Sequence, residues 1–144
     1  MSRSEKLLGV IGDDIRQDCE DYARLRDLMQ AQYQNLLQRD GASIESANQT
    51  IDALVEAARV RAQRRSKILA AFRLSADAAG MQRLIESRPE PVRNQLAQAW
   101  SQARVLAGEC KQLNERNGAL LAMQQDILKQ LLGGEDNRAQ LYAP

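Results

Sequence analysis

Apolar residues recur every three or four positions over three long stretches of the chain, which is the pattern of one face of an α-helix. The stretches cover roughly residues 4–39, 43–73 and 91–132. In the first, Cys19 fills the one gap in a stripe of larger apolar residues: Leu8, Ile11, Ile15, Tyr22, Leu25, Met29, Tyr33 and Leu36. In the third, the stripe positions are spaced alternately by four and three residues without exception, and nearly all of them are apolar. These patterns predict three long helices.

The breaks between these stretches are short. The polar linker around Gly41 forces the first two helices into an antiparallel hairpin, with Gly41 as the stop and Ser43 as the next N-cap. Residues 75–91 are irregular, but Met81, Leu84 and Ile85 at helical spacing predict a short helix over one end of the bundle.

The predicted fold is therefore all-α, an elongated antiparallel bundle of three long helices with one short helix in the second connection. We expect residues 1–134 to form the helical bundle and residues 135–144 to form a flexible C-terminal tail.

The third helix has a wider apolar face than its neighbours. Trp100, Leu121 and Leu128 flank its stripe and broaden it. Two neighbouring rods cannot cover so wide a face, so the pattern predicts a leftover apolar groove that suits a fourth helix.

Composition excludes several classes of function. The 144 residues suit one domain, and the formal net charge of +1 argues against a polyanion-binding protein. The chain has no His, no phosphate-binding loop and no metal-spaced cluster, so we expect no enzyme activity, no cofactor and no metal. No apolar run is long enough for a bilayer span and no signal peptide is evident. Cys19 and Cys110 fit buried thiols of a soluble cytoplasmic protein.

Two charged clusters have plain explanations. The first helix carries an acidic group that we interpret as a solvated face: Asp13, Asp14, Asp18, Glu20 and Asp21. The basic run from Arg59 to Lys67 complements the dipole at the end of the second helix. A phosphate-binding patch stays open as an alternative. Arg61 and Arg65 lie close to the apolar stripe, and their head groups would reach water or an acidic partner.

Polar residues interrupt the stripe of the third helix at one place. Asn117 occupies a stripe position, where a polar residue disfavours shifted pairings. Asn114 lies on nearly the same face, and Gly118 would let another backbone approach closely. Two Asn and a Gly are costly in a Leu-rich helix, which indicates a specific role.

These residues carry a resemblance to a known family. The run from Leu113 to Leu121 resembles the L-N-x-x-N-G-x-L-L signature of the FlgN family of flagellar type III export chaperones. The run from Arg64 to Leu69 is similar to the family's Arg and apolar residues at the end of the second helix. Leu141 and Tyr142 resemble its tail motif, although the usual Gly does not follow before Pro144.

The resemblance implies a function. Such a chaperone binds the C-terminal amphipathic segments of the hook-associated (hook–filament junction) proteins, prevents their premature assembly and delivers them to the export gate. The tail tyrosine, here Tyr142, would dock on the cytoplasmic domain of the gate protein. The family motif comprises Asn114, Asn117 and Gly118. We expect the client groove around eight residues of the third helix: Trp100, Leu106, Leu113, Asn117, Leu120, Leu121, Ile127 and Leu128.

Two other readings stay open. A homo-oligomeric structural coiled coil would pair the same apolar stripes with a copy of itself, and a helical adaptor protein stands beside it as a related hypothesis. A nucleic-acid-binding protein would use the basic run from Arg59 to Lys67.

Overall fold

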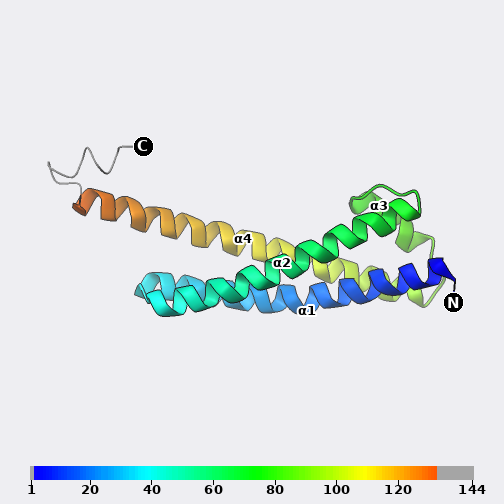
Figure 1. The fold of residues 1–144 in the computed structure, drawn as a ribbon, viewed down its shortest axis with the longest axis horizontal. Coiled ribbons are helices and arrows are strands. Elements are labelled where there is room, and N and C mark those ends of the chain that lie inside the picture. The colour runs from blue at the N-terminus through cyan, green and yellow to red at the C-terminus, as the bar shows by residue number, and fades with distance from the viewer. Residues whose placement is uncertain (1, 133–144) are drawn as a thin grey trace.

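The computed structural model describes residues 2–132 and is built of helices α1 (Arg3–Gln38), α2 (Gly41–Ala71), α3 (Ala78–Glu86) and α4 (Val92–Leu132). Figure 1 shows an elongated molecule in which the three long helices run its length. The prediction of an all-α chain with three long helices and one short helix in the second connection is confirmed.

The turn between α1 and α2 differs in detail from the predicted one. Arg39, rather than Gly41, adopts the left-handed conformation that ends α1, with φ of 56°. Asp40 is the N-cap of α2, and its carboxylate accepts a hydrogen bond of 3.2 Å from the main-chain N–H of Ser43. Asp is as good an N-cap as Ser, so the break falls a few residues earlier than the sequence indicated.

Both α2 and α4 pack along α1. Hydrogen bonds join Asp14 to Arg64 and Gln32 to Asn48, so α2 runs back along α1. Helix α4 runs in the same direction as α1, because Cys19 contacts Ala99 and the later Met29 contacts the later Asn117. Within residues 2–132, α2 and α4 do not pack closely against each other. Helix α1 is therefore the central rod, and one side of the bundle stays open.

The apolar core lies in two clusters. The larger cluster is at the end of the bundle that holds α3, and its buried residues come from all four helices: Ile11, Ile15, Ile68, Leu69, Met81, Leu84, Ile85, Leu96 and Ala103. The smaller cluster joins the middle of the three long helices: Leu25, Met29, Ile51, Leu54 and Cys110. Leu113 packs partly buried against the smaller cluster, and no described residue of α4 beyond it belongs to either cluster, which leaves the last turns of α4 with little apolar packing.

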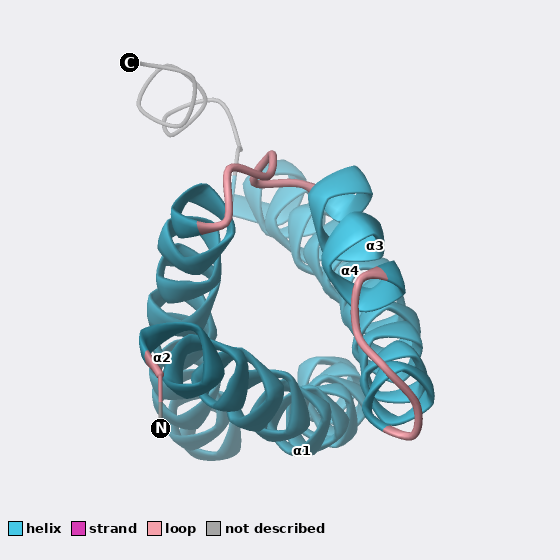
Figure 2. Cartoon of the chain, turned by 90° about the vertical axis from the view of Figure 1, so that its right-hand side faces the viewer, coloured by secondary structure: helices cyan, strands magenta, loops and turns pink. Residues whose placement is uncertain are grey.

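The short helix α3 closes one end of the bundle, as predicted, and lies beside α4 in the end view of Figure 2. Its start depends on a tight loop. Asp77 is the N-cap and accepts a hydrogen bond of 2.9 Å from the N–H of Gly80. A Cβ at Gly80 would lie 1.7 Å from the main-chain oxygen of Ser75, so only glycine fits there.

Only part of the acidic group of α1 is the solvated face that the sequence suggested: Asp13 and Glu20 are exposed, whereas Asp14 and Asp18 are buried. Asp18 is 1% exposed, and its carboxylate accepts hydrogen bonds from Arg61 (2.6 Å) and Arg65 (3.2 Å) of α2. Asp14 is also buried and accepts two bonds, of 2.7 and 2.8 Å, from Arg64. The spacing of 14 and 18 turns both carboxylates toward α2, and burial of either charge requires such a partner.

The two cysteine thiols face the contact between α1 and α4. Cys19 Sγ donates to the main-chain oxygen of Ala99, and Cys110 Sγ donates to that of Tyr22, each at 3.3 Å. Burial raises the pKa of both thiols, and the nearby Asp18 carboxylate raises that of Cys19 further. Cys110 is buried and Cys19 is half-buried, so both act as small packing residues.

Candidate functional site: a groove between α2 and α4

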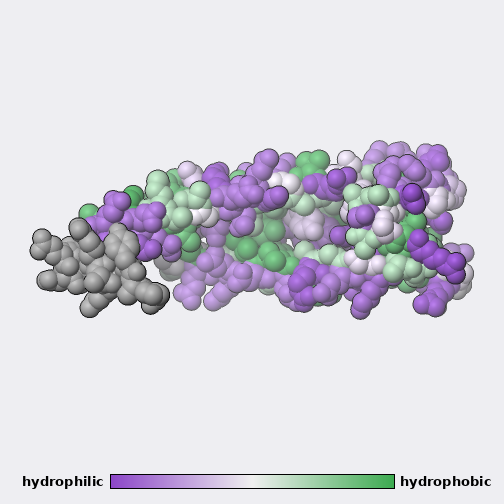
Figure 3. All heavy atoms as spheres, turned by 90° about the horizontal axis from the view of Figure 1, so that it is seen from above, coloured by the Kyte–Doolittle hydropathy of each residue, from purple (hydrophilic) through white to green (hydrophobic). Residues whose placement is uncertain are grey.

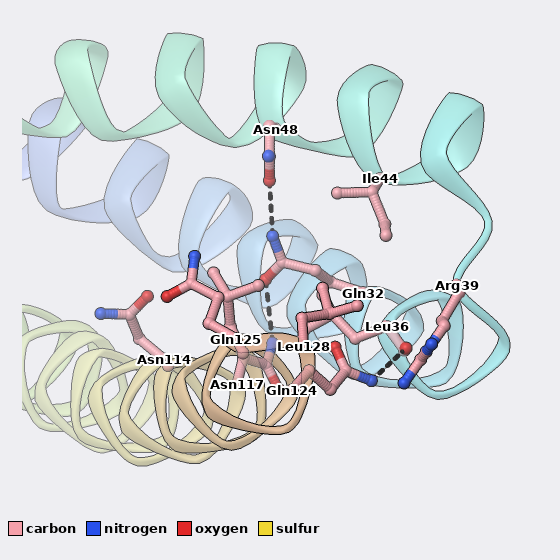
Figure 4. Close-up of a pocket in the computed structure, with 12 residues that line it drawn as sticks. Gln32, Leu36, Arg39, Ile44, Asn48, Asn114, Asn117, Gln124, Gln125 and Leu128 are labelled. Carbon is pink, nitrogen blue, oxygen red and sulfur yellow. Dashed lines mark hydrogen bonds between the residues drawn. The ribbon is translucent and has the colours of Figure 1, made fainter. Parts of the chain in front are cut away.

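A groove of about 450 Å³ lies where α2 and α4 separate over the last turns of α1. Figure 4 shows side chains of all three helices turned toward it. Its lining combines aliphatic and amide side chains with one arginine: Gln32, Leu36, Arg39, Ile44, Asn48, Asn114, Asn117, Gly118, Leu121, Gln124, Gln125 and Leu128. The family-like motif predicted from the sequence lies in this lining.

A chain of amide hydrogen bonds crosses the floor of the groove. Asn117 Nδ2 donates to Gln32 Oε1 (2.9 Å) and to the main-chain oxygen of Met29 (2.8 Å). Gln32 Nε2 in turn donates to Asn48 Oδ1 on α2 (Figure 4). One glutamine of α1 thus connects α2 to α4 at a level where the two helices do not touch.

A second amide bond holds α4 farther along. Gln124 Nε2 donates to the main-chain oxygen of Leu36 at 2.7 Å. Asn117 and Gln124 are seven residues apart, so they lie on the same face of α4, two turns from each other. Both bonds end on main-chain oxygens of α1, so polar contacts set the position of α4 where the apolar core thins out.

The last turns of α4 expose an unusual amount of apolar surface. Six large apolar residues between 121 and 132 are at least 40% exposed: Leu121, Met123, Ile127, Leu128, Leu131 and Leu132. Helix faces of this kind in soluble proteins usually mark a site of association. Seen from above, hydrophobic side chains also gather in a hollow about midway along the molecule, between hydrophilic rims (Figure 3).

A second depression of about 430 Å³ follows the groove toward the middle of the bundle. It shares Asn114 with the first and is lined by residues such as Val55 of α2 and Ala107 of α4. The open side of the bundle therefore extends along α1 beyond the groove itself.

The eight residues expected to mark the client groove fall into three groups. Leu121 and Leu128 line the groove with exposed side chains, and Ile127 is exposed beside them. Leu106, Asn117 and Leu120 are buried, and Leu113 packs partly buried against the middle core cluster. Trp100 packs against the other core cluster, where the Arg65 guanidinium lies 5.1 Å from its ring centroid. It is about 30 Å along the helix from Leu121.

The three motif residues differ in their surroundings. Asn117 is buried and bonded to α1, whereas Asn114 and Gly118 are exposed on the groove side of α4. A Cβ added to Gly118 would meet no atom of another described helix within 4 Å, so no other helix among residues 2–132 approaches it closely. Tyr142 and the predicted tail, residues 135–144, lie outside the described residues.

Several residues of the groove were not predicted from the sequence. Gln32 and Asn48 hold the amide chain, and Ile44 forms part of the apolar lining. Gln32 lies three residues after Met29 and four before Leu36, which puts it on the same side of the helix as the apolar stripe. This spacing was the signal from which Gln32 could have been placed on the packed side of α1.

The basic run of α2 offers little to a phosphate group. Arg61, Arg64 and Arg65 all bond to carboxylates of α1, and Arg59 bonds to Glu56. None of the described helices is long and hydrophobic enough to cross a bilayer. Among residues 2–132, acidic and cysteine side chains form no group of three able to hold a metal ion.

Comparison with known proteins supports the family resemblance that the motif in the groove carries. No curated protein and no solved structure matches the chain significantly. A family model described as FlgN protein matches residues 11–134, which include α1 from Ile11 onward, all of α2, α3 and α4, and thus the entire groove. The family consists of flagellar export chaperones rather than known enzymes, and membership implies binding of hook-associated proteins. The chain belongs to the FlgN family.

Proposed function

We propose that this protein is a cytoplasmic chaperone that binds the C-terminal amphipathic segments of hook-associated proteins in the groove between α2 and α4. The observation that carries the proposal is the open groove itself. It contains the family motif and adjoins the most apolar exposed stretch of α4. A client segment would add a helix on the side where α2 and α4 do not cover each other.

Burial of apolar surface would drive the binding. Leu121 and Leu128 are 44% and 43% exposed, and a client helix would remove much of that area from water. The client must become ordered as it binds, at a cost of several kcal/mol, which keeps the affinity moderate over a large contact. Moderate affinity allows the release that export requires. While it is bound, the client's own apolar face is covered and cannot assemble prematurely.

Delivery would use a different part of the chain. The resemblance to the family assigns docking on the cytoplasmic domain of the gate protein to Tyr142, ten residues beyond the end of α4. Tyr142→Ala should therefore leave folding and client binding intact and reduce capture of the gate domain. Loss of client binding in this variant would contradict the division of labour.

The client-binding proposal is tested with the purified chain and the C-terminal segments of the hook-associated proteins of the same organism. Light scattering after gel filtration should show a complex of defined stoichiometry. The double variant Leu121→Asp/Leu128→Asp should stay helical and lose about tenfold or more in affinity, because two charges would be buried without partners.

A matched control uses exposed valines away from the groove. Val60 and Val105 are 42% and 59% exposed, so Val60→Asp/Val105→Asp adds the same charge and should bind the client normally. Leu120 is 8% exposed, so Leu120→Asp should instead destabilise the fold. A tight homodimer that ignores every client segment would support the structural coiled coil in place of the chaperone.

A further inference from the structure

Nothing among residues 2–132 requires the glycine that lines the groove. Gly118 lies in the interior of α4, where glycine costs about 1 kcal/mol relative to alanine. Its φ angle is negative, and a Cβ there would meet no atom within 4 Å. In the part of the chain that the structure describes, neither backbone conformation nor packing requires glycine at this position.

The surroundings of Gly118 indicate what uses the space. Leu121 and Leu128 lie on the same lining, and Asn114 is one turn before it. A helix that crosses α4 here can approach closely only if the crossing point has no side chain, since axes separate by 8–10 Å when side chains intervene.

The chemistry of the lining restricts the partner further. Six of the twelve lining residues carry amides, four are aliphatic, and Arg39 is the one charged residue among them. Amides both donate and accept hydrogen bonds, so they pair with hydroxyl and amide side chains. A charged side chain that is buried against this lining away from Arg39 would lose its hydration without gaining an oppositely charged partner.

We infer that Gly118 is the point of closest approach of a bound client helix, and that the groove selects an aliphatic helix with uncharged polar flanks. Residues 114–128 of α4 line the groove over about 20 Å, which matches about four turns of the client. This inference rests on the proposed function and adds to it the chemistry of the client and the residue that admits its backbone.

The test compares two glycines of α4. Gly108 is also exposed, also meets nothing within 4 Å, and does not line the groove. Gly118→Ala and Gly108→Ala should both raise the Tm by about 2–5 °C, because alanine favours the helix. Gly108→Ala should bind hook-associated C-terminal segments like the wild type. Gly118→Ala should bind them about tenfold more weakly, and Gly118→Leu more weakly still.

Equal client affinity of Gly118→Ala and the wild type would overturn the inference and leave the proposed function standing. The affinity of the wild type should change less than about threefold between about 50 and 500 mM NaCl, since charge pairs contribute little. A tenfold loss over that range would show that charge carries recognition, against the inference.

Failure of the proposed function gives a different result. If the wild type binds none of the hook-associated segments, that function is wrong. The inference is then tested with a synthetic four-turn helix of Leu, Ser and Gln, whose binding should still weaken in Gly118→Leu and not in Gly108→Leu. No binding of this peptide, or a Gly118 effect confined to self-association measured by sedimentation, would overturn the inference.

Discussion

The side-chain amide of Asn117 in α4 donates a 2.8 Å hydrogen bond to the main-chain oxygen of Met29 in α1. Asn117 is 4% exposed, and the oxygen that accepts its hydrogen bond belongs to the main chain of the central helix. A buried amide needs such partners, so this bond sets which residues of α1 lie opposite the motif of α4.

Replacement of Asn117 should therefore cost stability. Asn117→Ala removes the side chain of α4 that donates to Gln32 Oε1, and it leaves a small cavity. We therefore expect the free energy of unfolding to fall by about 1–3 kcal/mol. Asn114→Ala is the control, because Asn114 is exposed and should change stability by no more than about 0.5 kcal/mol. Urea unfolding followed by circular dichroism measures both. Equal stability of the two variants would mean that the amide chain contributes nothing.

The buried ion pairs of the α1–α2 hairpin give a second prediction. Asp18→Asn leaves the charges of Arg61 and Arg65 without their shared carboxylate, so we expect destabilisation of about 3–5 kcal/mol. Asp18→Leu combined with Arg61→Met removes both buried charges and should recover much of that loss. The same urea experiment applies.

The control for the ion pairs is an exposed pair on the same helix. Asp13 and Arg16 have side chains that are 78% and 63% exposed. Asp13→Asn should change stability by less than about 1 kcal/mol, because water screens such a pair. A similar effect of Asp13→Asn and Asp18→Asn would contradict the importance of burial here.

A third prediction concerns the loop before α3. Gly80→Ala places a methyl group where the main-chain oxygen of Ser75 lies, so the loop must move and the Asp77 cap is lost. We expect a loss of about 2 kcal/mol or more, seen as a lower Tm. Gly9→Ala is the matched control: a Cβ there meets nothing within 4 Å, and this variant should be slightly stabilised. A stabilised Gly80→Ala protein would be inconsistent with this loop geometry.

Stability should also fall at alkaline pH. Burial, followed by the Asp18 charge, raises the pKa of Cys19 and Tyr22, and burial raises that of Cys110. The folded protein therefore keeps these protons to a higher pH than the unfolded chain. The stabilisation is complete below the ordinary thiol value of 9.0 and is lost as the pH rises above it.

Urea midpoints measured between about pH 7 and pH 10.5 test this dependence. The midpoint should stay nearly level up to about pH 8.5 and then decline. Cys19→Ala/Cys110→Ala should show a shallower decline, because the two thiols no longer titrate and Tyr22, whose pKa is raised by burial, remains. A midpoint that holds steady to pH 10.5 would be evidence against buried, protonated thiols.

Much of the fold could be predicted because each helix shows its own period. The stripe through Ile11, Ile15 and Leu25 is buried as expected, and the short helix at Met81, Leu84 and Ile85 packs over one end. The prediction for Asp14 and Asp18 was wrong because their partners lie more than forty residues away. Spacing within α1 gives the direction of a side chain and carries no information about what faces it.

The candidate site was predictable in part. The motif at Asn114, Asn117 and Gly118 directed attention to the correct region of α4, where the groove lies. The sequence did not separate Leu120, which is buried, from Leu121, which is exposed in the groove. Neighbouring positions on a helix point about 100° apart, and the assignment of each depends on where α1 lies.

The amino-acid sequence by itself determined the four helices, their approximate ends, the apolar face of each and the polar position at Asn117. The tertiary structure alone decided that α2 and α4 both pack on α1 and leave the groove between them uncovered. The physical reason is that periodicity is a local property set by 3.6 residues per turn. Which faces meet depends on contacts between residues far apart in the chain, such as Asn117 with Met29.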